Sequence, residues 1–145
     1  MRATERGAML RNEACPECGT AMSERRGRLK LPVNGEETTV PDATHLRCSR
    51  CRQVVLRVDD ARRFRQRALE IYRKKYGLLS ADEIRSIRGR FGLTQTSLAR
   101  LLRLGGNTIS GWEAGRNVQT GVMDMVLRMI RDLPGSLEYL RRHAA

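Results

Sequence analysis

The sequence predicts an α+β fold, in which a small β-rich domain is followed by an all-α domain of five helices. Two Cys-x-x-Cys pairs enclose 29 residues near the start of the chain, and this segment contains an Asn34-Gly35 turn between alternating apolar and polar residues. Asn-Gly between such runs is the strongest short signal for a β-hairpin. From residue 59 onwards, apolar residues recur at helical spacing between capping residues and glycines.

The four cysteines, Cys15, Cys18, Cys48 and Cys51, have the spacing of a metal site. A Cys-x-x-Cys loop lets two thiolates converge on one ion, and two such loops complete a tetrahedral site. Zn²⁺ suits this geometry best, and iron is the usual alternative. Because four thiolates leave no open position for substrate or water, we predict one structural Zn²⁺ per chain and no catalytic metal.

The cellular compartment follows from the same cysteines and from hydropathy. No apolar run of signal-peptide length opens the sequence, and no stretch of about 18 apolar residues would cross a membrane. We therefore predict a cytoplasmic protein with no membrane partner, whose thiols stay reduced. This disfavours a disulfide scaffold. A thioredoxin-like redox role is also disfavoured, because neither cysteine pair lies between a strand and a long helix.

The residues around the turn predict a zinc ribbon over residues 14–58. Leu29, Leu31 and Val33 alternate with polar residues, and Pro32 should restrict its strand to a sheet edge. The segment has too few large apolar residues for a self-sufficient core, so the metal should supply folding energy. His45 is expected to be exposed and not a ligand. The predicted strands span residues 27–33, 36–40, 43–48 and 53–58.

Charge separates the two halves of the chain. Residues 1–60 carry eleven basic and nine acidic residues, whereas residues 61–145 carry seventeen and seven, a net charge of +10. Such a basic field attracts polyanions by releasing their counterions. The few aromatic residues argue against a single-strand binder that stacks bases. A basic connector helix is predicted over residues 59–77, either as a solvated linker or as a phosphate contact.

Residues 78–145 predict a helix-turn-helix domain. Ser80 begins a capping box with Glu83, and Thr94 caps the next helix. A glycine turn at residues 104–106 then leads to a short third helix over residues 107–114, and two further helices follow. Two short helices joined by a tight glycine turn are typical of the helix-turn-helix, whose second helix enters the major groove of DNA.

The third helix and its surroundings contain the predicted DNA contacts. Ile109 and Trp112 are three residues apart and should face the core, which leaves residues 107, 108, 110 and 111 towards solvent or a groove. Asn107 would read adenine through N6 and N7, or serve only as a helix cap. Glu113 is expected at the surface or as a cap-bonding residue, and the methionines of the fourth helix in the core or at a dimer interface. The predicted contacts with bases or phosphates are Gln95, Asn107, Thr108, Ser110 and Arg116.

Four segments together resemble a known family. They are Cys-Pro-x-Cys-Gly-x-x-Met at residues 15–22, the second Cys-x-x-Cys, Leu-Ser-Ala-Asp-Glu-Ile at residues 79–84, and residues 92–95 with 104–116. Over about residues 14–140 the chain resembles the MqsA/YgiT-type antitoxins, which join an N-terminal zinc finger to an Xre-like (Xre/Cro-like) helix-turn-helix. The helix-turn-helix alone would match many Xre-type repressors, so the zinc module is the more discriminating half.

The resemblance implies a type II antitoxin that acts by binding and not as an enzyme. Its zinc domain would bind and neutralise a cognate toxin, commonly an mRNA interferase made from the adjoining gene. Its C-terminal domain would form a homodimer, bind a palindromic operator of double-stranded DNA and repress its own operon. The base-reading Asn of the family falls on Asn107, but its usual Arg partner falls on Gly111, which cannot supply a bidentate contact to guanine.

Two other interpretations stay open from the sequence. One is a stand-alone Xre-family, zinc-containing transcriptional regulator without a toxin partner. The other is a zinc-ribbon protein that binds RNA or the ribosome. For the antitoxin interpretation, we expect residues 1–13 to form a disordered leader, residues 14–58 the zinc ribbon, residues 59–77 the connector helix, and residues 78–145 the helix-turn-helix DNA-binding and dimerisation domain.

Overall fold

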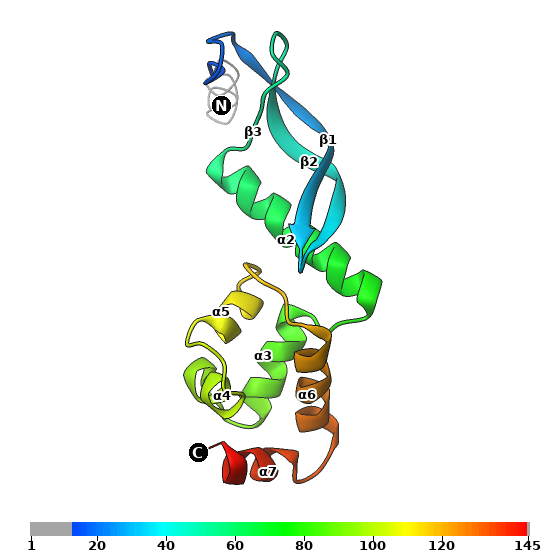
Figure 1. Cartoon of the computed structure of the whole chain (residues 1–145), viewed down its shortest axis with the longest axis vertical. Helices are drawn as coiled ribbons and strands as arrows, with labels where there is room; N and C mark the ends of the chain where they lie inside the picture. The colour runs from blue at the N-terminus through cyan, green and yellow to red at the C-terminus, as the bar shows by residue number, and fades with distance from the viewer. Residues whose placement is uncertain (1–12, 145) are drawn as a thin grey trace, which may run out of the picture. The chain divides into compact units, whose positions relative to one another are not determined.

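The computed structural model describes residues 13–144 and confirms the α+β fold (Figure 1). Nearly all of the predicted leader, residues 1–12, lies outside the described residues. The chain divides into two compact units, one of residues up to 31 with residues 39–67, the other of residues 32–38 with residues from 68 onwards. The elements are β1 (Met22–Val33), β2 (Glu36–Cys48), β3 (Val54–Val55), α2 (Val58–Tyr76), α3 (Ala81–Arg90), α4 (Gln95–Leu101), α5 (Thr108–Glu113), α6 (Gly121–Asp132) and α7 (Ser136–His143).

The three strands form one sheet in the order β1-β2-β3. β1 is an edge strand, as Pro32 predicts. The turn between β1 and β2 has positive φ at both central residues, 47° at Asn34 and 80° at Gly35, which is the backbone of a type I′ turn. β3 pairs antiparallel with the end of β2, where Leu46 lies opposite Val55. The predicted Asn-Gly hairpin is therefore confirmed.

The prediction of two separate strands over residues 36–40 and 43–48 was wrong. β2 runs unbroken through both, for 13 residues. The burial pattern of β2 explains the error. Thr38 and Val40 face inward, and Pro41 and Asp42 are both exposed. Inward-facing residues resume at Ala43. An irregularity at Pro41 shifts the alternation by one residue without ending the strand, and proline is tolerated at such points. β3 is shorter than predicted because α2 already begins at Val58.

One apolar cluster of the sheet lies around the cysteines. It consists of Cys15, Met22, Leu46 and Cys48, with Cys18 and Val55 packed against it. Two of the four buried members are themselves candidate metal ligands. Val33, Val40 and Ala43 of the two long strands are also buried. That a metal supplies folding energy to this part of the chain stays a prediction.

Local capping signals begin the helices where the sequence predicts. At α3, the backbone N–H of Glu83 donates to the Ser80 hydroxyl (3.1 Å) and the N–H of Ser80 donates to the Glu83 carboxylate (2.7 Å), which forms the predicted capping box. At α4, Thr94 accepts from the N–H of Ser97 at 3.0 Å. Gly77, with φ of +61°, ends α2 in the left-handed region, as a glycine can without strain.

The helices α3–α7 enclose one apolar core. Val122 on α6 lies outside this core and is 71% exposed. Within residues 13–144, the structure contains no helix of the length and apolar character needed to span a bilayer. The core consists of Leu79, Ile84, Ile87, Leu93, Leu98, Ala99, Ile109, Trp112, Leu127, Ile130 and Leu137.

Candidate metal centre and nucleic-acid interface

The structure brings all four cysteines together. Cys15 and Cys18 precede β1, Cys48 ends β2 and Cys51 lies in the turn that follows. All four Sγ atoms lie within 4.8 Å of one another, with Cys15 and Cys51 at 3.5 Å and Cys18 and Cys48 at 3.5 Å. Four ligands at about 2.3 Å from a tetrahedral zinc ion would stand about 3.8 Å apart. The four free thiols therefore have the separation needed to hold one metal ion.

The two cysteine loops have the same backbone geometry. The carbonyl of the first cysteine accepts from the N–H four residues later, from Gly19 to Cys15 at 2.8 Å and from Arg52 to Cys48 at 3.1 Å. Gly19 and Arg52 both have positive φ, 74° and 64°. Arg52 adopts this conformation although a side chain there costs about 1 kcal/mol, so closure of the loop offsets a local strain.

The pKa values of the thiols differ widely in the absence of a cation. Hydrogen bonds from the hydroxyl and backbone of Thr20 lower the pKa of Cys18 to about 6. A backbone hydrogen bond from Cys51 lowers the pKa of Cys48. Cys51 accepts a backbone hydrogen bond from Gln53, which lowers its pKa, but the neighbouring thiols, first Cys15, raise it to about 12. Four thiolates this close need a cation to be charged together, and a bound metal supplies one.

His45 is buried in the sheet and not exposed to solvent. The expectation of an exposed side chain was wrong, because His45 is 4% exposed and its Nδ1 lies 2.9 Å from the carbonyl oxygen of Ala43. Among the described residues, the group of candidate ligands consists of the four cysteines. The fold uses this histidine within the sheet, where a ring in contact with a backbone carbonyl is a satisfied polar group.

The helix-turn-helix is formed by α4, the turn of residues 102–107 and α5. The turn is closed by the N–H of Leu104, which donates to the carbonyl of Ala99 at 2.8 Å. Ile109 and Trp112 face the core, as predicted. Asn107 precedes α5, is exposed, and makes no side-chain capping hydrogen bond to this helix. Its carboxamide therefore has no capping role here.

The structure places the predicted DNA contacts with different accessibilities. Asn107 and Arg116 are exposed, whereas Gln95, Thr108 and Ser110 are half-buried. The Ser110 hydroxyl donates to the carbonyl of Asn107 at 3.0 Å and accepts from Nη2 of Arg116 at 3.1 Å. These bonds connect Ser110 on α5 to the backbone of Asn107, just before the helix, and to the side chain of Arg116, in the loop after it. Gln95 begins α4, the first helix of the motif.

Gly111 does not face a groove, contrary to the expectation. It is buried, and the side chain of Asn117 covers it. Helical spacing places position 111 correctly beside position 107 but contains no information about a loop residue that folds back later in the chain. Asn117 is the residue of this surface that the sequence analysis missed, and no local pattern would have revealed it.

The expectation of a surface position for Glu113 was wrong, because the residue is buried, and its carboxylate bonds to an arginine side chain and not to a helix cap. Its carboxylate accepts two hydrogen bonds from Arg88 of α3, at 3.0 Å from Nε and 2.8 Å from Nη2. This pairing raises the pKa of Arg88. Arg85 donates to the backbone carbonyl of Glu113 at 3.2 Å. Two arginines of α3 thus hold the end of α5 in place.

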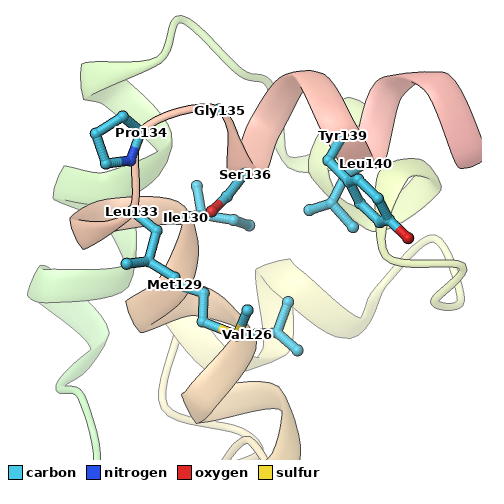
Figure 2. Close-up of a pocket in the computed structure, with 9 residues that line it drawn as sticks. All are labelled: Val126, Met129, Ile130, Leu133, Pro134, Gly135, Ser136, Tyr139 and Leu140. Carbon is cyan, nitrogen blue, oxygen red and sulfur yellow. The ribbon is translucent and has the colours of Figure 1, made fainter.

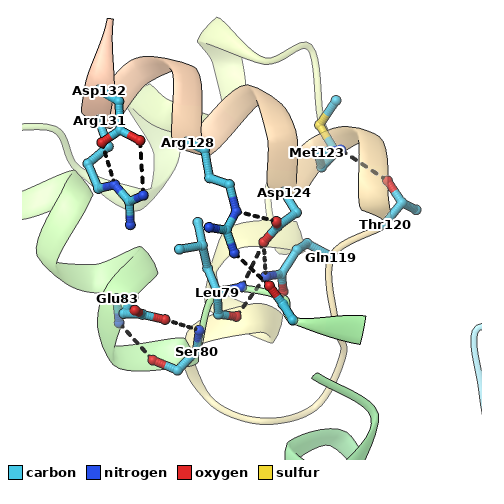
Figure 3. A network of polar contacts seen from close by, with 11 residues as sticks. Leu79, Ser80, Glu83, Gln119, Thr120, Met123, Asp124, Arg128, Arg131 and Asp132 are labelled. Carbon is cyan, nitrogen blue, oxygen red and sulfur yellow. Dashed lines mark hydrogen bonds and ion pairs between the residues drawn. The ribbon is translucent and has the colours of Figure 1, made fainter. Parts of the chain in front are cut away.

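A second polar network lies around the start of α6 (Figure 3). Asp124 accepts from the N–H of Leu79 (2.7 Å), from Gln119 (3.1 Å) and from Nε of Arg128 (2.8 Å). Burial raises the pKa of Asp124, but the hydrogen bonds from Arg128, Leu79 and Gln119 outweigh it and leave the pKa below its ordinary value. The buried Arg73 of α2 donates to Gln119 (3.3 Å) and to the carbonyl of Trp112 (3.1 Å), which connects this network to α5.

An apolar groove opens between α6 and α7 (Figure 2). Its volume is about 570 Å³. Met129, Leu133 and Tyr139 in its wall are all about half exposed, and Val122 and Met125 extend the exposed apolar surface along α6. The full lining is Val126, Met129, Ile130, Leu133, Pro134, Gly135, Ser136, Tyr139 and Leu140.

The fold and the cysteine site together define a two-part protein: a ribbon whose four cysteines can hold a metal ion is followed in the sequence by a helix-turn-helix domain. The chain belongs to the family described as the antitoxin component of a bacterial toxin-antitoxin system, MqsA, whose model matches residues 13–141. It is also similar to Antitoxin HigA-2 of Vibrio cholerae serotype O1, with 36% identity over 62 residues. That match covers 43% of this chain and 60% of the relative's length.

Proposed function

We propose that this antitoxin is a cytoplasmic, zinc-bearing, homodimeric repressor that neutralises a cognate toxin and autoregulates its own operon. It works by binding and not by catalysis. The observation that carries the proposal is the polar group around α5: exposed Asn107 precedes the helix, half-buried Ser110 lies on it, and exposed Arg116 in the following loop donates to Ser110. Ile109 and Trp112 bury another side of the helix. In a helix-turn-helix, the positions of the three polar residues are those that reach base edges and phosphates.

Charge supports double-stranded DNA as the partner of the helical part. The net charge of +10 over residues 61–145 would attract the phosphate backbone without regard to sequence. Asn107 would then contribute sequence preference through adenine, while Gln95, Thr108, Ser110 and Arg116 contact phosphates or base edges. The fixed position of α5, which Arg88 and Glu113 help to set, would keep this reading geometry constant.

The four-cysteine site would hold a structural Zn²⁺ through Cys15, Cys18, Cys48 and Cys51. When bound, the ion would neutralise the thiolates and close the two loops into one unit. Membership in a toxin-antitoxin family supports a toxin as partner, and we assign its docking to the zinc ribbon. The near-neutral charge of residues 1–60 suits a protein partner better than a nucleic acid. An mRNA interferase is the proposed class of toxin.

The apolar groove between α6 and α7 supports the homodimer. Exposed Val122, Met125, Met129, Leu133 and Tyr139 form more apolar surface than a monomeric helical domain of this size needs to leave uncovered. A second copy of the same surface is the proposed occupant, since a two-fold dimer would match the symmetry of a palindromic operator.

Binding to duplex DNA is tested by titrating the full chain against two probes at the same salt concentration. One is the duplex upstream of its own operon, and the other is a structured RNA of equal length. Fluorescence anisotropy should show tighter binding to the duplex. Preference for the RNA would contradict the repressor. Co-purification from its own cell tests the toxin, which should appear at equal stoichiometry with the antitoxin.

A further inference from the structure

The loop after α5 folds back onto α5 at Gly111. The carbonyl of Gly111 accepts hydrogen bonds from the N–H groups of Arg116 (2.9 Å) and Asn117 (3.2 Å). A Cβ on residue 111 would lie 2.9 Å from Nδ2 of Asn117, and 3.6 Å and 3.7 Å from its Cγ and Cβ. The amide nitrogen of Asn117 therefore occupies space that a side chain at position 111 would need.

This places the carboxamide of Asn117 next to Asn107. Residues four apart in a helix lie on the same face, about 5–6 Å from one another. Asn107 immediately precedes α5 and Gly111 follows four residues later, so Asn117 fills the neighbouring place on that face. Both asparagines are exposed. The hydrogen bond from Arg116 to Ser110, at 3.1 Å, holds the adjoining loop residue against the same helix.

We propose that Asn117 is a second base-reading residue, an inference that rests on the proposed DNA binding of α5. A carboxamide offers a donor and an acceptor together, which suits N6 and N7 of adenine in the major groove. Because base pairs repeat every 3.4 Å, a separation of about 5–6 Å corresponds to one or two base pairs. Asn107 and Asn117 thus read two base pairs of each half-site that are adjacent or separated by one.

The test selects binding sites for the full chain from a library of randomised 30-base-pair duplexes. The unaltered protein should enrich half-sites with two constrained base pairs at this spacing. Selection with Asn107→Ala should lose one of them, and selection with Asn117→Ala the other. The affinity of Asn117→Ala for the duplex selected by the unaltered protein should fall about 5- to 150-fold, the loss expected for one bidentate contact.

Gly111→Ala is the matched structural variant. The added methyl group must push the amide of Asn117 aside, so affinity for the selected duplex should fall several-fold. Because alanine stabilises a helix interior relative to glycine, the melting temperature should not decrease, which separates the loss of binding from misfolding. In an Asn117→Ala background the methyl group has nothing to displace, and Gly111→Ala should have no further effect.

Two outcomes would count against the inference in different ways. If Asn117→Ala selects the same site with unchanged affinity while Asn107→Ala alters it, Asn117 is not a reader and the proposed repressor stands. If the unaltered protein enriches no sequence at all, the proposed DNA binding and the role of Asn117 fail together.

Discussion

At the scale of single residues, Asn107 has the clearest predicted effect on function. Its side chain is exposed and is not used as a cap. We expect Asn107→Ala to weaken binding to the specific operator by about 1–3 kcal/mol and to random duplex by much less. Competition titrations with both duplexes measure the difference. Equal losses on the two would show that Asn107 contributes nothing to sequence preference.

Glu113 should matter for stability instead. Its carboxylate is 2% exposed and paired with Arg88, so Glu113→Ala leaves a partly buried guanidinium without its partner and should cost about 3 kcal/mol of unfolding free energy. Asp82→Ala is the control, because Asp82 also pairs with an arginine but is 90% exposed, and its loss should cost less than about 0.5 kcal/mol. Urea titration gives both values. Similar losses would show that burial of Glu113 has no energetic weight.

Individual residues also show which features of the structure can be predicted from the sequence and which cannot. The Ser80 capping box and the Asn34-Gly35 turn depend on residues within three positions of each other, and both were predicted. The cysteine cluster was expected because ligand spacing is itself a local signal. The burial of Glu113 depends on its pairing with Arg88, 25 residues earlier. The burial of Gly111 depends on Asn117, which lies in a loop that folds back onto α5. The periodicity of apolar residues along a helix does not predict contacts between residues that are far apart in the sequence.

At the scale of elements, the two cysteine loops should make metal binding depend on pH. The pKa of Cys18 in the folded chain, about 6, lies below its ordinary value of 9.0. The folded form therefore binds fewer protons, and the stabilisation by this thiolate is complete above about pH 9 and lost as the pH falls through about 6. We expect bound zinc to be retained at pH 7 and released as acid protonates the thiolates, as measured with a chelating dye.

Thr20→Val provides the control for this pH dependence. It removes the hydroxyl that lowers the pKa of Cys18 and keeps the shape of the side chain. The release of zinc should then begin at a higher pH. An unchanged release profile would mean that Thr20 does not set the proton affinity of the site.

The helix α6 should control the oligomeric state. Met129→Glu places a charge in the wall of the apolar groove, and burying it in a dimer interface would carry a desolvation penalty. We expect sedimentation velocity to change from dimer to monomer. Val58→Glu is the matched control, since Val58 on α2 is also an exposed apolar residue but lies outside the groove. A dimer that survives Met129→Glu would place the interface elsewhere.

At the scale of the whole molecule, the chain should have two sources of stability. The apolar cluster around the cysteines includes candidate ligands, whereas the helical core draws apolar residues from α3–α7. We expect Cys48→Ser to abolish metal binding and to unfold the β-rich residues 14–58, while α3–α7 stay folded. Amide hydrogen exchange on the full chain measures this residue by residue. Uniform loss of protection in both parts would contradict the independence of the two cores.

The edge strand β1 has a consequence for the behaviour of the protein at high concentration. An unpaired strand edge is a template for lateral addition of further strands, which leads to aggregates. β1 carries exposed Arg25, Arg26, Arg28 and Lys30, followed by Pro32. Like charges would repel an identical strand, and the proline removes one backbone donor. Within residues 13–144, β1 is hydrogen-bonded to β2 alone among the strands, and we expect its charges and proline to disfavour amyloid-like stacking of the ribbon with its own copies.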